Sequence, residues 1–312
     1  MTQFGMFVDN SKQESFKVTE GKSYTLSDGL PYSTKNSIEH YTHMSIFQYP
    51  FLFDGYFINL KKTELPDVDF DVIFLTIEKH YDEFSTRQIQ KKYPNAKIFG
   101  VLKEIYFIDE RLRCKALAEC DQILIPFSHK YMHYFYQKNT GKETIWLPHP
   151  YDIDYLNNKF YKQERTHDIF AYISPTLPEL RRSNTEQFSN YISNKYKLSI
   201  KHVLTDTWPE FMEEISTCKF LFNLDPTLSS GNTGIQAALL GLHTLGGNND
   251  SITHLFPNSC GTNFDQLEEI FSRLNSDNSL YLNSIQNSYQ LVNEIYGMES
   301  VKSKILDLYD KY

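Results

Sequence analysis

The chain has 312 residues, of which 40% are hydrophobic and 22% are charged, and its formal net charge is −8. This composition fits a soluble globular protein, and the length is sufficient for two domains of ordinary size. The negative net charge argues against functions that require binding to a long polyphosphate, although local basic patches can coexist with it.

Cysteine spacing and hydropathy argue against several further classes of protein. The four cysteines have no CxxC spacing, so we expect reduced thiols rather than a disulfide framework or a zinc site. No segment approaches the roughly 20 apolar residues of a transmembrane helix. The first nine residues lack the basic start and the long apolar core of a signal peptide. We therefore expect a cytoplasmic protein with no membrane span.

The first half of the chain alternates apolar runs, typical of buried strands, with segments of helical periodicity. We expect irregular structure at residues 11–36, which are mostly polar. The expected strands are 5–8, 71–76, 97–102, 122–126 and 144–147, and the expected helices are 36–48, 82–93, 109–118 and 128–138. This alternation predicts an α/β fold with a parallel, doubly wound sheet.

Segment 147–154 contains two prolines and no helix or strand pattern, which indicates a hinge between domains. The alternation of strands and helices resumes after it. The expected strands are 168–173, 199–204, 220–224 and 243–245, and the expected helices are 179–194, 208–216, 234–240, 266–275, 279–297 and 300–312. We therefore expect a second doubly wound domain, with the boundary near residue 150.

The most informative stretch is 220–247, which reads as strand, small-residue loop, helix, glycine and strand. Such a βαβ unit opens its loop at the carboxyl end of a strand, where open α/β sheets bind ligands. The backbone N–H groups of residues 229–234 would then lie at a helix N-terminus, which suits the phosphates of a nucleotide. The alternative is a buried βαβ unit that binds no ligand.

Residues 231–243, with the sequence GNTGIQAALLGLH, resemble the donor-binding segment of glycosyltransferases with the GT-B fold. In that family a glycine-containing loop leads into a helix that carries a Glu, an Ala and then a Gly, followed by a short apolar strand. Gln236 stands where many retaining members have Glu, and His243 stands where many have Pro. These two departures leave open both the ribose contact and the choice between inverting and retaining transfer.

This resemblance implies two Rossmann-like domains that face each other across a cleft. Residues 1–149 would be the acceptor-binding domain, residues 150–298 the nucleotide-sugar-binding domain, and 299–312 a helix that crosses back to the first domain. The implied activity is metal-independent hexosyl or pentosyl transfer to a saccharide or another hydroxyl acceptor. UDP is the most frequent carrier in the family. The helix dipole and basic side chains would hold the leaving diphosphate in place of a metal.

The resemblance also places the donor contacts on segments that follow two strands of the second domain. Arg181 and Arg182 would meet the pyrophosphate with their planar forks, unless they are a solvated pair on an exposed helix. Gln236 would hydrogen-bond a ribose hydroxyl or remain an ordinary helix residue. Asp225 would bind a sugar hydroxyl or cap a turn. The predicted donor-binding residues are Ser174, Arg181, Arg182, Asp225, Ser229, Ser230, Gly231, Asn232, Thr233, Gly234 and Gln236.

Inverting transfer needs a base that takes the proton from the acceptor hydroxyl, and Asp, Glu or His usually serves. The candidates near the expected cleft edge of the first domain are Asp28, Glu39, His43 and Glu78. Aromatic rings on the same loops would stack on a saccharide acceptor, although they also fit an aromatic-rich core. These rings are Tyr24, Tyr32, Tyr41 and Tyr81. No cluster of His, Asp or Glu has metal-ligand spacing, so we expect no bound metal.

Two other functions stay open. A phage-type DNA glycosyltransferase that acts on hydroxymethylated bases would need a basic face, for which residues 87–92 and 111–115 are the local candidates. A non-catalytic nucleotide- or sugar-binding protein would account for Gln236 in place of Glu and for the lack of a clear base. The chain has no GxSxG motif, no P-loop and no Rossmann GxGxxG motif.

Overall fold

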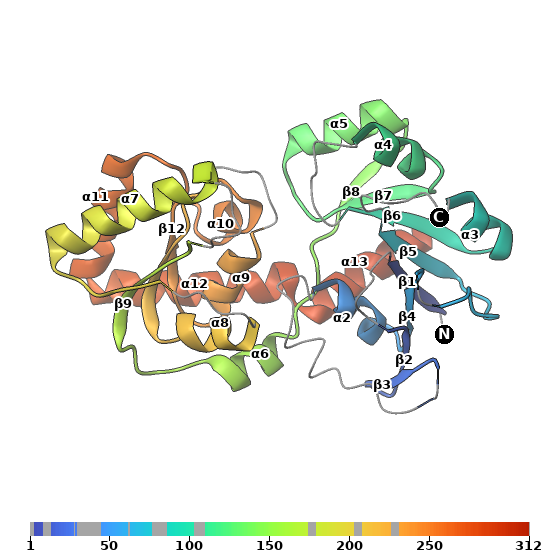
Figure 1. Ribbon diagram of the computed structural model, residues 1–312, viewed down its shortest axis with the longest axis horizontal. Helices are drawn as coiled ribbons and strands as arrows, with labels where there is room; N and C mark the ends of the chain where they lie inside the picture. The colour runs from blue at the N-terminus through green and yellow to red at the C-terminus, as the bar shows by residue number, and fades with distance from the viewer. Residues whose placement is uncertain are drawn as a thin grey trace. The chain divides into compact units, whose positions relative to one another are not determined.

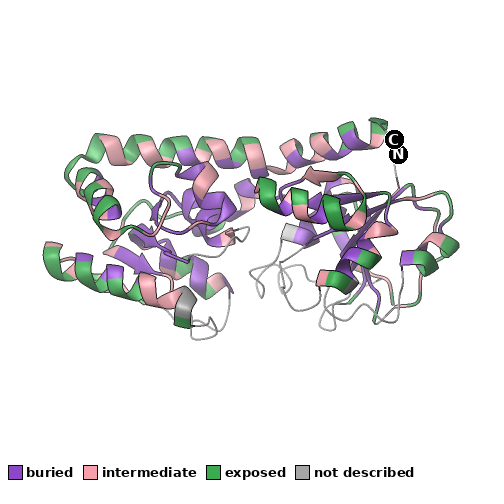
Figure 2. Ribbon diagram, turned by 90° about the horizontal axis from the view of Figure 1, so that it is seen from above, coloured by how far each residue is buried: buried purple, intermediate pink, exposed green. Residues whose placement is uncertain are grey.

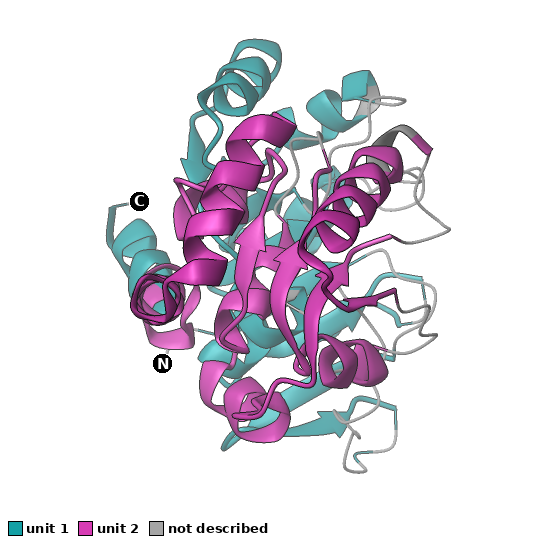
Figure 3. Cartoon of the chain, turned by 90° about the vertical axis from the view of Figure 1, so that its left-hand side faces the viewer, with its two compact units in different colours: residues 1–39, 43–151, 301–312 teal, residues 40–42, 152–300 magenta. Residues whose placement is uncertain are grey.

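In the computed structural model, the chain forms two compact units (Figure 3). The first unit comprises residues 1–39, 43–151 and 301–312, and the second comprises residues 40–42 and 152–300. The structure describes residues 3–8, 14–27, 29, 45–61, 63–76, 86–102, 110–173, 179–202, 208–225 and 231–311.

The described strands of the first unit form one mixed sheet (Figure 1). They are β1 (Phe4–Val8), β2 (Phe16–Thr19), β3 (Lys22–Thr25), β4 (Tyr56–Asn59), β5 (Val72–Thr76), β6 (Lys97–Val101), β7 (Gln122–Ile125) and β8 (Thr144–Trp146). Their order across the sheet is β3-β2-β4-β1-β5-β6-β7-β8. Neighbours from β4 to β8 run parallel, whereas β2 is antiparallel to both β3 and β4.

Helices cover both faces of this sheet. They are α2 (Ser45–Leu52), α3 (Thr86–Lys92), α4 (Glu110–Ala118), α5 (Lys130–Thr140) and the part of α13 (Met298–Lys311) from Val301 onward. Ile89 of α3 and Tyr136 of α5 share one core cluster with Ile73 of β5. The next residue of β5, Phe74, points to the opposite face and packs edge-on against Tyr49 of α2, with 5.3 Å between ring centroids. The sheet is therefore doubly wound, as predicted.

Residues 16–25 form a hairpin at the sheet edge, so the prediction of irregular structure there is wrong. Phe16 and Val18 are fully buried on one face of β2. Glu20 and Gly21 connect the strands with φ angles of 51° and 70°, and two positive φ angles give a hairpin turn that matches the twist of the strands. Four-residue strands give too short an alternation to stand out among polar neighbours. Strand β4 is a further element that the sequence analysis does not anticipate.

The other strands predicted for this unit are confirmed to within two residues, and so are the helices over 109–118 and 128–138. The helix predicted over 36–48 is described from Ser45 and continues to Leu52, four residues beyond its predicted end. Its predicted start, and the predicted start of the helix over 82–93, lie outside the described residues.

The described strands of the second unit form a parallel sheet in the order β10-β9-β11-β12. They are β9 (His167–Ala171), β10 (Ile200–Lys201), β11 (Cys218–Phe222) and β12 (His243–Leu245). The helices of this unit are α6 (Ile153–Phe160), α7 (Glu179–Tyr196), α8 (Trp208–Ile215), α9 (Asn232–Leu239), α10 (Asp250–Leu255), α11 (Phe264–Ser276) and α12 (Asn278–Tyr296).

Consecutive residues of β9 show that this second sheet also has helices on both faces. Ile169 joins a core cluster with Phe188 of α7 and Phe271 of α11. Phe170 points the other way and meets Phe211 of α8 edge-on, with 5.6 Å between ring centroids. Figure 2 shows the resulting pattern in each unit, in which buried strands lie beneath helices with exposed outer faces. The second doubly wound sheet is therefore confirmed.

Two helices of the second unit are absent from the sequence prediction. Helix α6 begins at Ile153, within the segment 147–154 for which the sequence predicts no helix. Its N-cap Asp152 accepts a hydrogen bond from the backbone N–H of Tyr155 at 3.1 Å. Its buried residues Ile153, Leu156 and Phe160 have helical spacing. The two prolines just before it disguise this signal. Helix α10 has only six residues, which is too short for a visible periodicity.

Arg165 ties the ends of two helices together within the second unit. Its guanidinium donates hydrogen bonds to the backbone oxygens of Ser216, just after α8, and Leu240, just after α9. Carbonyl groups at helix ends lack intrahelical partners, so this side chain supplies what the helices cannot. Burial of the group lowers the pKa of Arg165.

We expect Arg165→Met to lower the free energy of unfolding by about 2–4 kcal/mol, because two buried carbonyls lose a charged donor. Equilibrium unfolding in urea measures this loss. The control is Glu164→Gln, which changes the exposed neighbouring residue and should cost less than about 0.5 kcal/mol. Equal stability of the Arg165→Met variant and the wild type would contradict the capping role.

Candidate functional site

Two neighbouring parallel strands bring the starts of α7 and α9 to one edge of the second sheet. Strand β9 pairs with β11, and Ala171 lies opposite Phe222 at their carboxyl ends. Helix α7 follows β9 along the chain, and α9 follows β11. This is the edge at which parallel α/β sheets bind ligands.

Gly231 immediately precedes α9 and has a backbone conformation that requires glycine. Its φ and ψ angles are 73° and 50°, in the left-handed region. A Cβ atom at this position would lie 2.2 Å from Oδ1 of Asn249 and 2.6 Å from Oγ of Ser251. The chain therefore enters α9 through a turn that leaves no room for a side chain.

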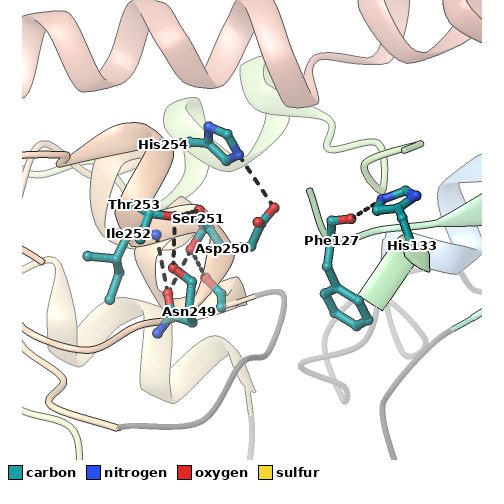
Figure 4. Close-up of polar contacts among 9 residues, drawn as sticks. Phe127, His133, Asn249, Asp250, Ser251, Ile252, Thr253 and His254 are labelled. Carbon is teal, nitrogen blue, oxygen red and sulfur yellow. Dashed lines mark hydrogen bonds and ion pairs between the residues drawn. The ribbon is translucent and has the colours of Figure 1, made fainter. Parts of the chain in front are cut away.

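Helix α10 and its N-cap residue contact this turn (Figure 4). Oδ1 of Asn249 accepts a hydrogen bond from the backbone N–H of Ile252 at 3.2 Å and so caps the helix. The hydroxyl of Ser251 donates to the backbone oxygen of Gly231. A Cβ atom on Gly234 would lie 2.5 Å from that same hydroxyl, so α9 and α10 pack closely. These contacts fix the backbone at the N-terminus of α9.

Two buried amide side chains flank this helix start and keep an unused acceptor. Asn223 follows β11, is 4% exposed, and donates from Nδ2 to the hydroxyl of Thr233 at 2.9 Å. Gln236 lies one turn into α9 and is 1% exposed. Asn223 Oδ1 and Gln236 Oε1 both lack a hydrogen-bond partner within the described residues. Because a buried acceptor without a donor is costly, both oxygens are suited to receive hydrogen bonds from a ligand.

Further predicted residues lie at the same sheet edge. Asp225 is buried, and its backbone oxygen accepts from the N–H of Asn248 at 3.2 Å. Arg182 is partly buried in the first turn of α7. The same helix is joined to β11, because the hydroxyl of Thr185 accepts from the backbone N–H of Leu224 at 2.9 Å. The structure therefore places the start of α7 against the end of β11.

The remaining predicted site residues lie outside what the structure describes. All four candidate bases belong to this group, as does the side chain of Arg181. The residues are Asp28, Glu39, His43, Glu78, Ser174, Ser229 and Ser230. Within the described part of the chain, no group of three or more His, Cys, Asp or Glu residues is arranged to hold a metal ion. Among its described helices, none is long and apolar enough to cross a membrane.

Sequence reasoning missed three residues that shape the site, namely Asn223, Asn249 and Ser251. The available signal for Asn249 is an N-cap residue followed by Asp in the first helical turn. No local pattern marks Asn223, since its partner Thr233 lies ten residues away and is brought near by the βαβ crossover.

Comparison with solved structures finds proteins whose fold is similar to that of this chain. A glycosyltransferase from Rickettsia africae has 9% identity and a TM-score of 0.57, and the match covers 99% of this chain and 98% of that one. An α-glucosyltransferase in complex with UDP and DNA containing an HMU base has 13% identity and a TM-score of 0.55, with coverage of 78% and 81%. HepE from Anabaena, in complex with UDP, has 9% identity and a TM-score of 0.54, with coverage of 78% and 79%.

The chain has the GT-B fold. The same comparison also finds the N-terminal domain of a Candida albicans trehalose-6-phosphate phosphatase, with 12% identity and a TM-score of 0.54, covering 78% of this chain and 70% of that one. The fold therefore does not by itself fix the reaction. No protein-family model and no curated protein matches the sequence.

His243, which stands where many members of the GT-B family have Pro, belongs to the interior of the second unit. It is 3% exposed at the start of β12. Its Nδ1 lies 2.5 Å from the hydroxyl of Ser284, and its Nε2 lies 2.7 Å from that of Ser259. Burial lowers the pKa of His243 to about 3, so the ring is neutral at physiological pH.

Proposed function

We propose that this chain transfers a sugar from a nucleotide sugar, with UDP as the carrier, to a hydroxyl acceptor. The observation that carries the proposal is the pair of unused buried acceptors, Asn223 Oδ1 and Gln236 Oε1, beside the start of α9 in a chain with the GT-B fold. Proteins that share the fold are named as complexes with UDP, among them the α-glucosyltransferase and HepE.

The diphosphate of the donor would lie at the N-terminus of α9. The positive end of the helix dipole favours a negative charge there. Arg182, in the first turn of α7, would add a bidentate contact to the phosphate oxygens. Gln236 Oε1 would accept a hydrogen bond from a ribose hydroxyl, in place of the Glu that many family members carry. These groups would stabilise the leaving diphosphate without a metal ion.

The acceptor hydroxyl would attack the anomeric carbon of the sugar. The bond between that carbon and the diphosphate oxygen breaks, the nucleoside diphosphate leaves, and the hydroxyl proton passes to a base. Asp28, Glu39, His43 and Glu78 remain the proposed bases, and a saccharide remains the proposed acceptor. The transfer of a hexosyl or pentosyl group and the cytoplasmic location likewise stay predictions from the sequence, which leaves inverting and retaining transfer both open.

Thermal unfolding with a panel of nucleotides and nucleotide sugars tests the proposal. UDP and at least one UDP-sugar are expected to raise the unfolding temperature, because a ligand that binds only the folded state stabilises it. No stabilisation of a folded sample by any nucleotide would contradict the proposal. Donor binding without hydrolysis or transfer to any acceptor would instead identify a non-catalytic binding protein.

We expect Gln236→Leu to weaken UDP binding about tenfold, because one hydrogen bond to the ribose is lost. For a uridine nucleotide that lacks both ribose hydroxyls, Gln236→Leu and the wild type should bind with equal affinity. Gln236→Glu retains an acceptor and is expected to bind UDP at least as tightly as the wild type. Gln187→Leu, at an exposed position of α7, is the control. Calorimetric titration measures all four proteins, and unchanged UDP affinity in Gln236→Leu would remove this residue from the site.

Modified DNA is a second candidate acceptor, because one protein of the same fold is named as a complex with DNA that contains an HMU base. The basic segment 87–92 gives it little support. Arg87 pairs with Glu119 at 2.6 Å, and Lys92 pairs with Asp67 at 3.1 Å, so part of its charge is neutralised. Gel retardation at low salt, with modified and plain duplex DNA, distinguishes modified DNA from a saccharide as the acceptor.

A further inference from the structure

The second unit contains a cavity of about 400 Å³ apart from the proposed donor site. It lies between the segment that follows α10 and the two helices α11 and α12, and His243 forms part of its wall. His243 is the first residue of β12, whereas Asn223 of the proposed donor site follows the last residue of β11. Because these strands are parallel, the cavity and Asn223 belong to opposite edges of the sheet.

Most of the cavity wall is apolar. The side chains come from three elements and leave a space that is within the size range of small-molecule sites in proteins. The apolar lining residues are Leu255, Phe256, Pro257, Ile270, Leu274, Leu280 and Leu291. Such a wall favours a ligand with an apolar body, since burial of each methylene group contributes to binding.

The polar groups deep in the wall are already paired. Both ring nitrogens of His243 contact serine hydroxyls, those of Ser259 and Ser284. The ring is neutral, because its burial disfavours the charged form. The inner wall therefore offers no charge to a ligand.

The mouth of the cavity is different, because it carries one positive charge and unpaired amides. Arg273 of α11 is exposed and forms no ion pair with any described residue, including the carboxylates one turn away at Glu269 and Asp277. The side chains of Asn283 and Asn287 on α12 are exposed and make no hydrogen bond to a described residue. No Asp or Glu lines the cavity.

We infer that this cavity binds a small amphipathic carboxylate, with its alkyl chain among the leucines and its carboxylate at Arg273. The guanidinium of Arg273 presents a planar fork that matches a carboxylate, and the amides of Asn283 and Asn287 add donors beside it. Arg273 is the charged residue among those that line the cavity, so the lining favours an anionic head group over a neutral or cationic one.

Calorimetric titration of the full chain with octanoate, butyrate and octan-1-ol tests the inference. Octanoate is expected to bind with one-to-one stoichiometry and at least tenfold more tightly than either of the others. Butyrate lacks four methylene groups of the chain, and octan-1-ol lacks the charge. Absence of octanoate binding, or equal binding of octanoate and octan-1-ol, would overturn the inference.

Three variants locate the bound octanoate. Arg273→Met should weaken octanoate binding at least tenfold, whereas Arg111→Met, at an exposed arginine of the first unit, should leave it unchanged. Asn287→Trp places a large ring at the mouth from an exposed position of α12 and should abolish binding. Circular dichroism and thermal unfolding establish that each variant is folded. Octanoate affinity that is unchanged in folded Arg273→Met or Asn287→Trp would overturn the inference, whatever the outcome of the UDP experiments.

Discussion

Replacing Gly231 with alanine is expected to lower the free energy of unfolding by about 2–3 kcal/mol. A left-handed conformation costs a residue with a Cβ atom about 1–2 kcal/mol. The added atom would also lie 2.2 Å from Oδ1 of Asn249, and moving that side chain removes the cap of α10, which costs about 1 kcal/mol more. We also expect weaker UDP binding, because the backbone at the start of α9 must shift.

Gly141→Ala is the matched control for this substitution. Gly141 has a φ angle of 70°, close to the 73° of Gly231, but a Cβ atom there meets nothing within 4 Å. The loss of stability in Gly141→Ala should therefore be only the conformational cost of about 1–2 kcal/mol, with no effect on UDP binding. Unfolding in urea compares the two variants. Equal losses would show that the packing of Gly231 against α10 contributes nothing.

The second large effect that we expect is a loss of stability in mild acid that originates from His243. The pKa of His243 in the folded protein is about 3, against an ordinary value of 6.5. Above pH 6.5 the ring is neutral in both the folded and the unfolded chain. Below pH 6.5 only the unfolded chain takes up the proton, so the free energy of unfolding falls by about 1.4 kcal/mol per pH unit. At pH 5 the loss from this group is about 2 kcal/mol.

Urea unfolding at several pH values between 7.5 and 5 measures this dependence. His243→Gln removes the titrating ring and should reduce the slope of stability against pH, even though the variant is less stable at every pH. His202→Gln, at an exposed position of the same unit, should keep the wild-type slope. A slope that is the same in His243→Gln and the wild type would mean that His243 has the same pKa in the folded and unfolded chain, which would contradict the prediction.

The alternation of strands and helices from β5 to β8 and from β9 to β12 was predictable from the sequence. Runs such as 72–75 and 220–222 are apolar throughout, because a strand covered on both faces has no solvent-facing side. Helices such as α12 are long enough for periodicity to be visible. The elements that escaped prediction are β2, β3, β4 and α10, whose four to six residues carry too few positions for a period, and α6, whose signal is disguised by the two prolines before it.

The candidate site was predictable only where its residues are neighbours in sequence. The turn at Gly231 and the helix that carries Gln236 follow from a local pattern of small residues. The contacts that fix that turn come from Asn249 and Ser251, some twenty residues later, and depend on how α10 folds back on α9. The absence of a partner for Gln236 Oε1 is likewise a property of packing, which no spacing in the sequence reveals.

The edge hairpin of the first unit has a consequence for solubility. Strand β4 has four buried residues and pairs with β1 on one side, so without β2 its other side would be an open row of unpaired backbone groups. Open apolar edges of this kind recruit strands from other chains and begin aggregation. The hairpin replaces that edge with β3, a strand of four residues that starts at the exposed Lys22. A short edge with a lysine is a poor template, so the hairpin helps to keep separate copies of the chain apart at high concentration.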